Sequence, residues 1–187
     1  MSEISSNQFP EMYEKLGIHI DELGCVMLDV DASEVQEYPN QEVFYTSPDE
    51  KKFWIKGFVA GKNPHVTLLF GLMKEGKEYA PYIKTVLADW KIESVKVASL
   101  GFFETPYGEE PYTCFVAHLE VTPELIEGRQ RLQLLPHVDN FPDFKPHVTI
   151  GYIKQGFEDE VFTYYQFENK LVGKEFKVVG INLGEHE

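Results

Sequence analysis

Residues 63–70 of the chain read Asn-Pro-His-Val-Thr-Leu-Leu-Phe, and residues 145–152 read Lys-Pro-His-Val-Thr-Ile-Gly-Tyr. The tetrapeptide Pro-His-Val-Thr therefore occurs twice, and an aliphatic and an aromatic residue recur in register after it. Both segments are rich in β-branched and aromatic residues and are bounded by Pro and Gly, which is typical of buried strands. The repeat predicts a two-fold site built from two equivalent strands.

Strand alternation predicts which side chains of each copy share a face. In the first copy, one face carries His65, Thr67 and Leu69, and the other carries Val66, Leu68 and Phe70. In the second copy, the corresponding sets are His147, Thr149 and Gly151, and Val148, Ile150 and Tyr152. We therefore expect each strand to present an imidazole and a hydroxyl to a pocket wall, with Phe70 and Tyr152 in the core.

The rest of the chain predicts a mostly antiparallel α+β fold. Strands are expected at 23–30, 64–72, 94–103, 112–121, 145–153 and 174–183, and helices at 77–90, 122–135 and 157–171. The helix at 122–135 has a clear start, because Thr122 is a good N-cap and Pro123 suits the first helical position. Residues 1–22 are expected to form a polar lead-in. Residues 23–187 should form a single domain of two pseudo-symmetric lobes, because no flexible linker divides them.

Charge and composition restrict the partners. The net charge of −14 argues against a protein that tracks a long nucleic-acid backbone, since neutralising phosphates requires clustered Lys and Arg. A small anionic ligand in a local pocket remains compatible with this charge. Arg occurs only as Arg129 and Arg131, so a bound phosphate must be met mainly by Lys, His, hydroxyl and backbone N–H groups.

The cysteines and the hydropathy pattern indicate the compartment. Cys25 and Cys114 each fall inside an expected strand and are interpreted as small buried residues in a reducing compartment. The chain begins without an apolar signal core, and no apolar run approaches transmembrane length. We expect a cytoplasmic protein, in the host cytoplasm if the source is viral, with no membrane partner. The pattern does not indicate an oligomeric state.

Two imidazoles and two hydroxyls on one surface suit phosphodiester chemistry. A neutral imidazole can take a proton from a nucleophile while a protonated one delivers a proton to the leaving oxygen. The threonine hydroxyls can donate to non-bridging phosphate oxygens. A zinc site is the main alternative use of these histidines, but zinc takes three or four ligands with local spacings that the chain lacks. We therefore expect neither a metal nor another cofactor.

With His65-Val66-Thr67 and His147-Val148-Thr149, the chain resembles the 2H phosphoesterase superfamily, which includes 2′-5′ RNA ligase-like proteins and RNA cyclic phosphodiesterases. The resemblance covers the strand and helix order from about Leu23 to Leu183. It implies a bilobal α+β fold in which two pseudo-symmetric, mostly antiparallel sheets flank a central cleft, with helices outside.

The same resemblance implies an activity. His65 and His147 would act as acid and base in a metal-independent attack on a phosphodiester, with Thr67 and Thr149 binding the phosphate. Which histidine is the base is not indicated. The superfamily also includes phage enzymes that degrade cyclic oligonucleotide messengers of the CBASS anti-phage system. The substrate is thus expected to be a 2′,3′-cyclic phosphate, a 2′-5′ linkage or a cyclic oligonucleotide.

Four further residues are weaker candidates for substrate binding. Lys145 lies beside the second motif and could attract phosphate, although a solvated strand-end lysine is an equal alternative. Gly151 could let substrate approach the backbone closely. Trp54 and Tyr107, like Phe103, could stack on a nucleobase, and core packing explains them equally well. His118 is expected to be a partly buried structural residue.

Two non-enzymatic hypotheses compete with catalysis. The first is a nucleotide-binding module that sequesters a messenger without cleaving it, which has no need of two proton-transfer groups. The second is an acidic mimic of nucleic acid that blocks a basic partner, and it depends only on the charge of −14. In the second case, changing the histidines would leave function intact.

Overall fold

The computed structural model describes residues 23–33, 35, 64–105, 112–139, 143–154, 156, 158–159 and 171–184. In these residues the elements are β1 (Gly24–Asp31), β2 (His65–Leu72), the 3-10 helix η6 (Gly76–Tyr79), α3 (Ala80–Val86), β3 (Ser94–Thr105), β4 (Tyr112–Leu119), α4 (Pro123–Leu132), β5 (His147–Lys154) and β6 (Glu175–Asn182). All six expected strands are present. The expected lead-in at 1–22 lies outside the described residues, as does almost all of the expected helix at 157–171.

The strands form one antiparallel sheet in the order β2-β1-β6-β3-β4-β5. Its halves, β2-β1-β6 and β3-β4-β5, correspond to the two lobes expected from the sequence. They join where Ser94–Lys96 of β3 pairs with Glu175–Lys177 of β6. The predicted α+β class is therefore confirmed, and the two predicted sheets are halves of one continuous sheet.

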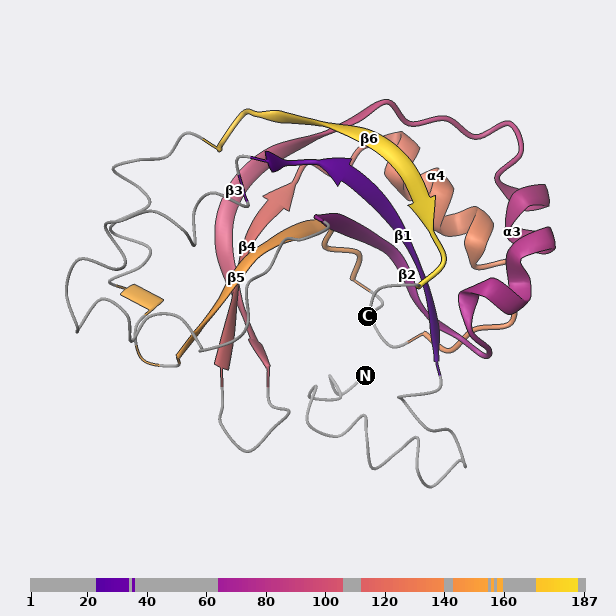
Figure 1. Ribbon diagram of the computed structural model, residues 1–187, viewed down its shortest axis with the longest axis horizontal. Coiled ribbons are helices and arrows are strands. Elements are labelled where there is room, and N and C mark those ends of the chain that lie inside the picture. The colour runs from indigo at the N-terminus through magenta and orange to yellow at the C-terminus, as the bar shows by residue number, and fades with distance from the viewer. Residues whose placement is uncertain are drawn as a thin grey trace, which may run out of the picture.

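The sheet is strongly arched, and α3 and α4 lie on its outer, convex side (Figure 1). Alternate residues of each strand face these helices and are buried, as alternation requires. The core they form is made of Val26, Leu28, Val30, Val66, Leu68, Leu69, Phe115, Ala117, Val148, Ile150 and Phe176 from the strands, with Ile83, Leu87, Trp90, Leu125 and Leu132 from the helices and the turn between them. The concave face carries the other strand residues, polar and apolar, including His65, Thr67, His147 and Thr149.

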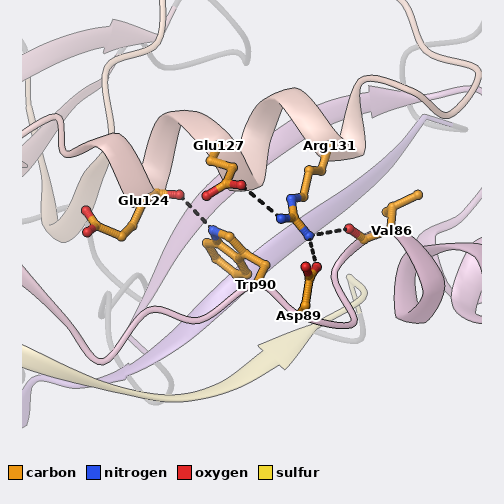
Figure 2. Close-up of polar contacts among 6 residues, drawn as sticks. All are labelled: Val86, Asp89, Trp90, Glu124, Glu127 and Arg131. Carbon is orange, nitrogen blue, oxygen red and sulfur yellow. Dashed lines mark hydrogen bonds and ion pairs between the residues drawn. The ribbon is translucent and has the colours of Figure 1, made fainter.

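The two helices are held together by polar contacts at their meeting point, shown in Figure 2. The indole Nε1 of Trp90 donates to the backbone oxygen of Glu124 at 2.9 Å. The guanidinium of Arg131 bonds the Asp89 carboxylate, Glu127 Oε1 at 2.9 Å and the Val86 oxygen at 3.1 Å. These contacts hold α4 against the end of α3 and the turn that follows it.

Helix α4 starts as the sequence predicts. The Thr122 hydroxyl accepts a hydrogen bond from the Leu125 N–H at 3.3 Å, and Pro123 occupies the first turn. The N-cap therefore satisfies one of the otherwise unpaired donors of the helix end. The helix also ends earlier than expected, at Leu132.

In the part of the chain that the structure describes, no helix is both long and apolar enough to cross a membrane.

Candidate active site

A bulge in β2 decides which of its side chains reach the concave face. The paired positions of β1 and β2 are Asp29–His65, Met27–Thr67, Val26–Leu69 and Cys25–Phe70. Leu68 therefore has no counterpart in β1. Because directly opposed residues of an antiparallel pair share a face, His65, Thr67 and Phe70 lie on the concave face, while Leu68 and Leu69 are both buried in the core.

The second motif strand contains the same irregularity at the same place. The paired positions of β4 and β5 are His118–His147, Val116–Thr149, Phe115–Gly151 and Cys114–Tyr152. Here Ile150 is the additional residue, and it is buried with Gly151 on the core side. The repeat seen in the sequence thus extends to a repeated bulge in the backbone.

The bulges overturn the predicted facing of the residues that follow each threonine. One additional residue inverts the alternation, so Leu69 is in the core and the half-buried Phe70 is on the concave face, opposite to both expectations. Gly151 is in register with the fully buried Phe115 rather than beside His147. The side chain of Tyr152, which was expected in the core, lies outside what the structure describes.

The two motif strands are the outermost strands of the sheet, yet they meet. The arch brings β2 and β5 into contact, and Figure 1 shows the two strands converging in the middle of the fold. His65 and His147 are the first residues of these strands. Electrostatic repulsion from His65 lowers the pKa of His147, so the two rings act on each other. The two motifs therefore lie close to each other, as the sequence predicted.

A backbone contact fixes the start of each motif strand in the same way. The carbonyl of Pro64 accepts from the Val30 N–H at 3.1 Å, and the carbonyl of Pro146 accepts from the Leu119 N–H at 2.9 Å. Each proline carbonyl thereby ties the strand start to the neighbouring strand. Each histidine then begins its strand in the same orientation relative to its neighbour.

His147 is held as a neutral ring with one defined nitrogen available. Its Nδ1 lies 2.9 Å from the backbone oxygen of Lys145, which can only accept, so Nδ1 carries the proton and Nε2 keeps its lone pair. Burial is the main cause that lowers the pKa of His147; the hydrogen bond to the Lys145 carbonyl raises this pKa in part, and repulsion from His65 lowers it further. The Phe103 ring packs edge-on against His147, with 4.8 Å between ring centroids. These features suit a proton acceptor near neutral pH.

His118 is partly buried, as expected, and the structure also shows it beside the second motif histidine. It is the cross-strand neighbour of His147, and the same Phe103 ring packs against it at 5.1 Å. Its ring lies over Gly101, where a Cβ would come within 2.5 Å of Nε2. Burial chiefly lowers the pKa of His118, followed by repulsion from His147 and Lys145. Its position in an ordinary strand carried no motif that could have indicated this.

His65 has a different neighbour. Asp29 is directly opposite it on β1, and Asp29 is in turn opposite Gly180 of β6. Asn182 Nδ2 lies 3.5 Å from Asp29 Oδ1, at the long end of hydrogen-bonding distance. One motif histidine therefore has a carboxylate beside it and the other an imidazole.

Both cysteines belong to this surface rather than to the core in which they were expected. Cys25 and Cys114 occupy equivalent positions, opposite residues 70 and 152, and are half-buried. Burial raises the pKa of the Cys25 thiol and raises that of Cys114 to about 11. Both thiols are therefore protonated at neutral pH, which makes them poor nucleophiles.

Arg129 of α4 supports the motif strands from the convex side. Its Nη1 donates to the oxygen of Leu68, the bulged residue of β2, at 3.1 Å. The guanidinium also lies over the Phe144 ring, 5.0 Å from its centroid, three residues before His147. One side chain thus contacts the β2 bulge and the segment that leads into β5.

Of the other residues predicted to bind substrate, the structure describes Lys145 but not Trp54 or Tyr107. Lys145 is exposed immediately before the second motif, where its carbonyl holds His147. Trp54 and Tyr107 lie outside the described residues. Among the residues that the structure describes, no group of three or more His, Cys, Asp and Glu side chains is arranged to hold a metal ion.

Comparisons with known proteins agree with this geometry. A family model described as the 2′-5′ RNA ligase superfamily matches residues 44–187. No curated protein sequence matches the chain. The structure of Kluyveromyces marxianus Usb1 is similar over 88% of this chain and 95% of that one, with a TM-score of 0.58 and 12% identity. The same protein with uridine monophosphate gives a TM-score of 0.55 over 89% and 96% at 12% identity. At this identity the likeness shows the fold.

Proposed function

This chain belongs to the 2′-5′ RNA ligase superfamily, and we propose that it is a metal-independent phosphodiesterase acting on a small nucleotide phosphodiester. Membership and fold support a phosphodiesterase- or ligase-type activity, in agreement with the resemblance that the two motifs predicted. Hydrolytic cleavage, the roles of individual residues and the substrate are the proposal.

The observation that carries the proposal is the meeting of the two His-x-Thr motifs on one concave surface. Their strands are at opposite ends of the hydrogen-bonding order, yet β2 and β5 are in contact and His65 perturbs His147. A fold that needed these residues only for packing would have no reason to bring two half-buried imidazoles together. Paired imidazoles are suited to divided acid–base work.

The mechanism follows from what each side chain can donate or accept. One histidine removes the proton of the attacking hydroxyl, from water or a ribose, as the new P–O bond forms. The other gives its proton to the leaving oxygen as the old P–O bond breaks. Thr67 and Thr149, on the concave face beside each histidine, donate to the non-bridging oxygens, where negative charge builds up in the transition state. Lys145, exposed just before the second motif, attracts the phosphate in this proposal.

A small nucleotide fits the charge and the fold relationship. A chain with a net charge of −14 would repel a long polyanion but can hold one phosphate in a local site. The solved Usb1 structure with uridine monophosphate shows that a protein of this fold holds a mononucleotide. A 2′,3′-cyclic phosphate, a 2′-5′ linkage and a cyclic oligonucleotide messenger of the CBASS type are the proposed substrates. We further propose that the protein acts in the cytoplasm.

The experiment that tests the proposal is a substrate panel with millimolar EDTA present. The panel contains 2′,3′-cyclic nucleotides, 2′-5′ oligoadenylates, cyclic dinucleotides and cyclic trinucleotides, with products separated by chromatography. We expect turnover of at least one class, and a loss of about 10²–10⁴-fold in His65→Ala and in His147→Ala. Intact ligand recovered after stoichiometric binding would instead favour the sequestering module. Turnover that EDTA abolishes would exclude a metal-independent reaction.

A further inference from the structure

A row of polar side chains crosses the second half of the concave face. Ser99 of β3 is directly opposite His118 of β4, and His118 is directly opposite the motif residue His147 of β5. Because directly opposed residues of an antiparallel pair share a face, the three side chains lie on one surface. Neighbouring strands are about 4.8 Å apart, so the row extends about 10 Å from His147 towards β3.

The equivalent row in the first half of the sheet has a different chemistry. There Gly180 of β6, Asp29 of β1 and His65 of β2 are directly opposed in the same order. The position next to the motif histidine is thus an aspartate in one half and a histidine in the other. A carboxylate can only accept hydrogen bonds and repels an anion, whereas an imidazole N–H donates. The second half is therefore the one suited to hold an anion beside its motif.

The His118 ring is fixed by packing. The Phe103 ring lies edge-on against it, with 5.1 Å between ring centroids. Its Nε2 lies over Gly101, where a Cβ would come within 2.5 Å, so the absence of a side chain at Gly101 makes room for the ring. None of the residues that the structure describes makes a hydrogen bond to the His118 ring. A fixed, half-buried imidazole without such a partner is suited to bind a ligand.

A lysine ammonium acts on the same ring. Burial chiefly lowers the pKa of His118, and repulsion from His147 and Lys145 lowers it further, so both groups are close enough to interact with it. A bound anion would be attracted by the Lys145 ammonium and could accept from the His118 N–H and the Ser99 hydroxyl. Ser99 and Lys145 are exposed, so a ligand in solution can reach these donors.

We propose that Ser99, His118 and Lys145 form a second anion-binding site, which takes a phosphate of the substrate other than the one that is cleaved. This inference rests on the proposed phosphodiesterase function and specifies its substrate class. With the scissile phosphate between the motif histidines, the next phosphate of the substrate lies over the row from His118 to Ser99. The site favours a diester with a second phosphate one nucleoside away, as in an oligonucleotide or a 5′-phosphorylated nucleotide, over a single nucleoside 2′,3′-cyclic phosphate.

Two nucleotides that differ by one phosphate test this site without any cleavage. The ligands are uridine 3′-monophosphate and uridine 3′,5′-bisphosphate, and isothermal titration calorimetry of the full chain gives a Kd for each. Hydrogen bonds to a charged group are strong enough to change affinity about tenfold, so the bisphosphate should bind at least about tenfold more tightly.

A third ligand distinguishes the two sources of the second phosphate. It is the bisphosphate with a methyl ester on its 5′-phosphate, which makes that group a diester. Binding as tight as that of the bisphosphate would mean that the site accepts an internucleotide linkage. Weaker binding would mean that it prefers a terminal phosphate.

Three variants locate the effect through the ratio of the two Kd values. His118→Ala should bring this ratio to within about twofold of one, because it removes the central donor of the row. Lys145→Ala should lower it by about threefold, as expected for one partly solvated charge. The control Lys84→Ala removes the same charge from α3, on the convex side, and should keep the wild-type ratio (Figure 1). Both ligands are measured on each protein, so a general loss of folded protein affects both alike.

Two results would overturn the second site: a ratio near one in wild type, and a wild-type ratio in His118→Ala. If the substrate panel shows turnover in either case, the proposed phosphodiesterase function stands without the second site. If neither nucleotide binds and no member of the panel is cleaved, both the second site and the proposed function are refuted.

Discussion

Replacing Gly128 by alanine should destabilise the protein, although the same change in an exposed helix is stabilising. Within a helix, alanine is favoured over glycine by about 1 kcal/mol. At position 128 of α4, however, a Cβ would lie 2.5 Å from Cζ2 and 2.7 Å from Cε2 of Trp90. Comfortable carbon contacts begin at about 3.5 Å, so helix and indole must separate by about 1 Å.

The cost can be estimated from what that separation disturbs. Trp90 is only 8% exposed and its indole N–H is bonded to the Glu124 oxygen at 2.9 Å. Overpacking a buried site costs about 1–3 kcal/mol, and losing the hydrogen bond costs about 1 kcal/mol more. After subtracting the helix gain of about 1 kcal/mol, Gly128→Ala should lower the free energy of unfolding by about 1–3 kcal/mol.

Urea denaturation of four proteins tests the reasoning: wild type, Gly128→Ala, Trp90→Leu and the double variant. With the indole removed, the alanine should become neutral or stabilising, so the sign of its effect reverses. A stabilising Gly128→Ala in the wild-type background would refute the argument. An unchanged effect in the Trp90→Leu background would also refute it, because the contact with Trp90 would then not be the cause.

Three further predictions concern the site and its support. Arg129→Met should lower the free energy of unfolding by about 2–4 kcal/mol, since it loses a charged hydrogen bond to Leu68 and the contact with Phe144. Urea denaturation measures this free energy, and Arg129→Lys should lower it by less than Arg129→Met does. If Arg129→Met lowers it by less than about 0.5 kcal/mol, neither contact contributes to stability. Thr67→Val and Thr149→Val should each lower kcat by about 10–100-fold at unchanged fold stability, because each removes one hydrogen bond to a charged oxygen. Steady-state kinetics measures kcat, and a wild-type value in either variant would rule out phosphate binding by that hydroxyl. The lowered pKa values of His118 and His147 mean that the unfolded chain binds more protons, so the stability they contribute is present above a pH of about 6.5 and is lost as the pH falls through their lowered values. Thermal melts should show this loss of stability as the pH falls below about 6.5, and the His118→Asn, His147→Asn double variant should lose less stability than wild type. An equal loss in the double variant would exclude these two histidines as its source.

The positions of the strands along the chain and the closeness of the two motifs could be predicted because they depend on local patterns. Pro-His-Val-Thr encodes a strand start, and its duplication encodes the pseudo-symmetry that brings β2 and β5 together. The cap at Thr122 likewise depends only on its own neighbours. Such signals lie within a few residues and are readable without knowing the tertiary structure.

The facing of Leu69, Phe70 and Gly151 could not be predicted because a bulge has no clear local signature here. Strict alternation holds up to each threonine and fails directly after it. In β2 the carbonyl of the bulged residue accepts a hydrogen bond from Arg129, which is distant in sequence, so this contact could not be predicted from the strand itself.

The placement of His118 and Asp29 beside the motif histidines could not be predicted for a related reason. Each reaches this position only through the register of the neighbouring strand, which pairs it with His147 or His65. Composition and spacing describe single strands, whereas a site on a sheet is built across strands.

The most direct measurement of the central claim is the coupling between His65 and His147 in catalysis. The values of kcat/KM are determined for wild type, His65→Ala, His147→Ala and the double variant, with EDTA present, on the substrate found in the panel. Two groups of one acid–base pair act as a unit, so the double variant should lose no more than a few-fold beyond the worse single variant, with each single loss about 10²–10⁴-fold. Losses that multiply in the double variant, or near-native activity in either single variant, would contradict the claim that the two motifs form one catalytic site.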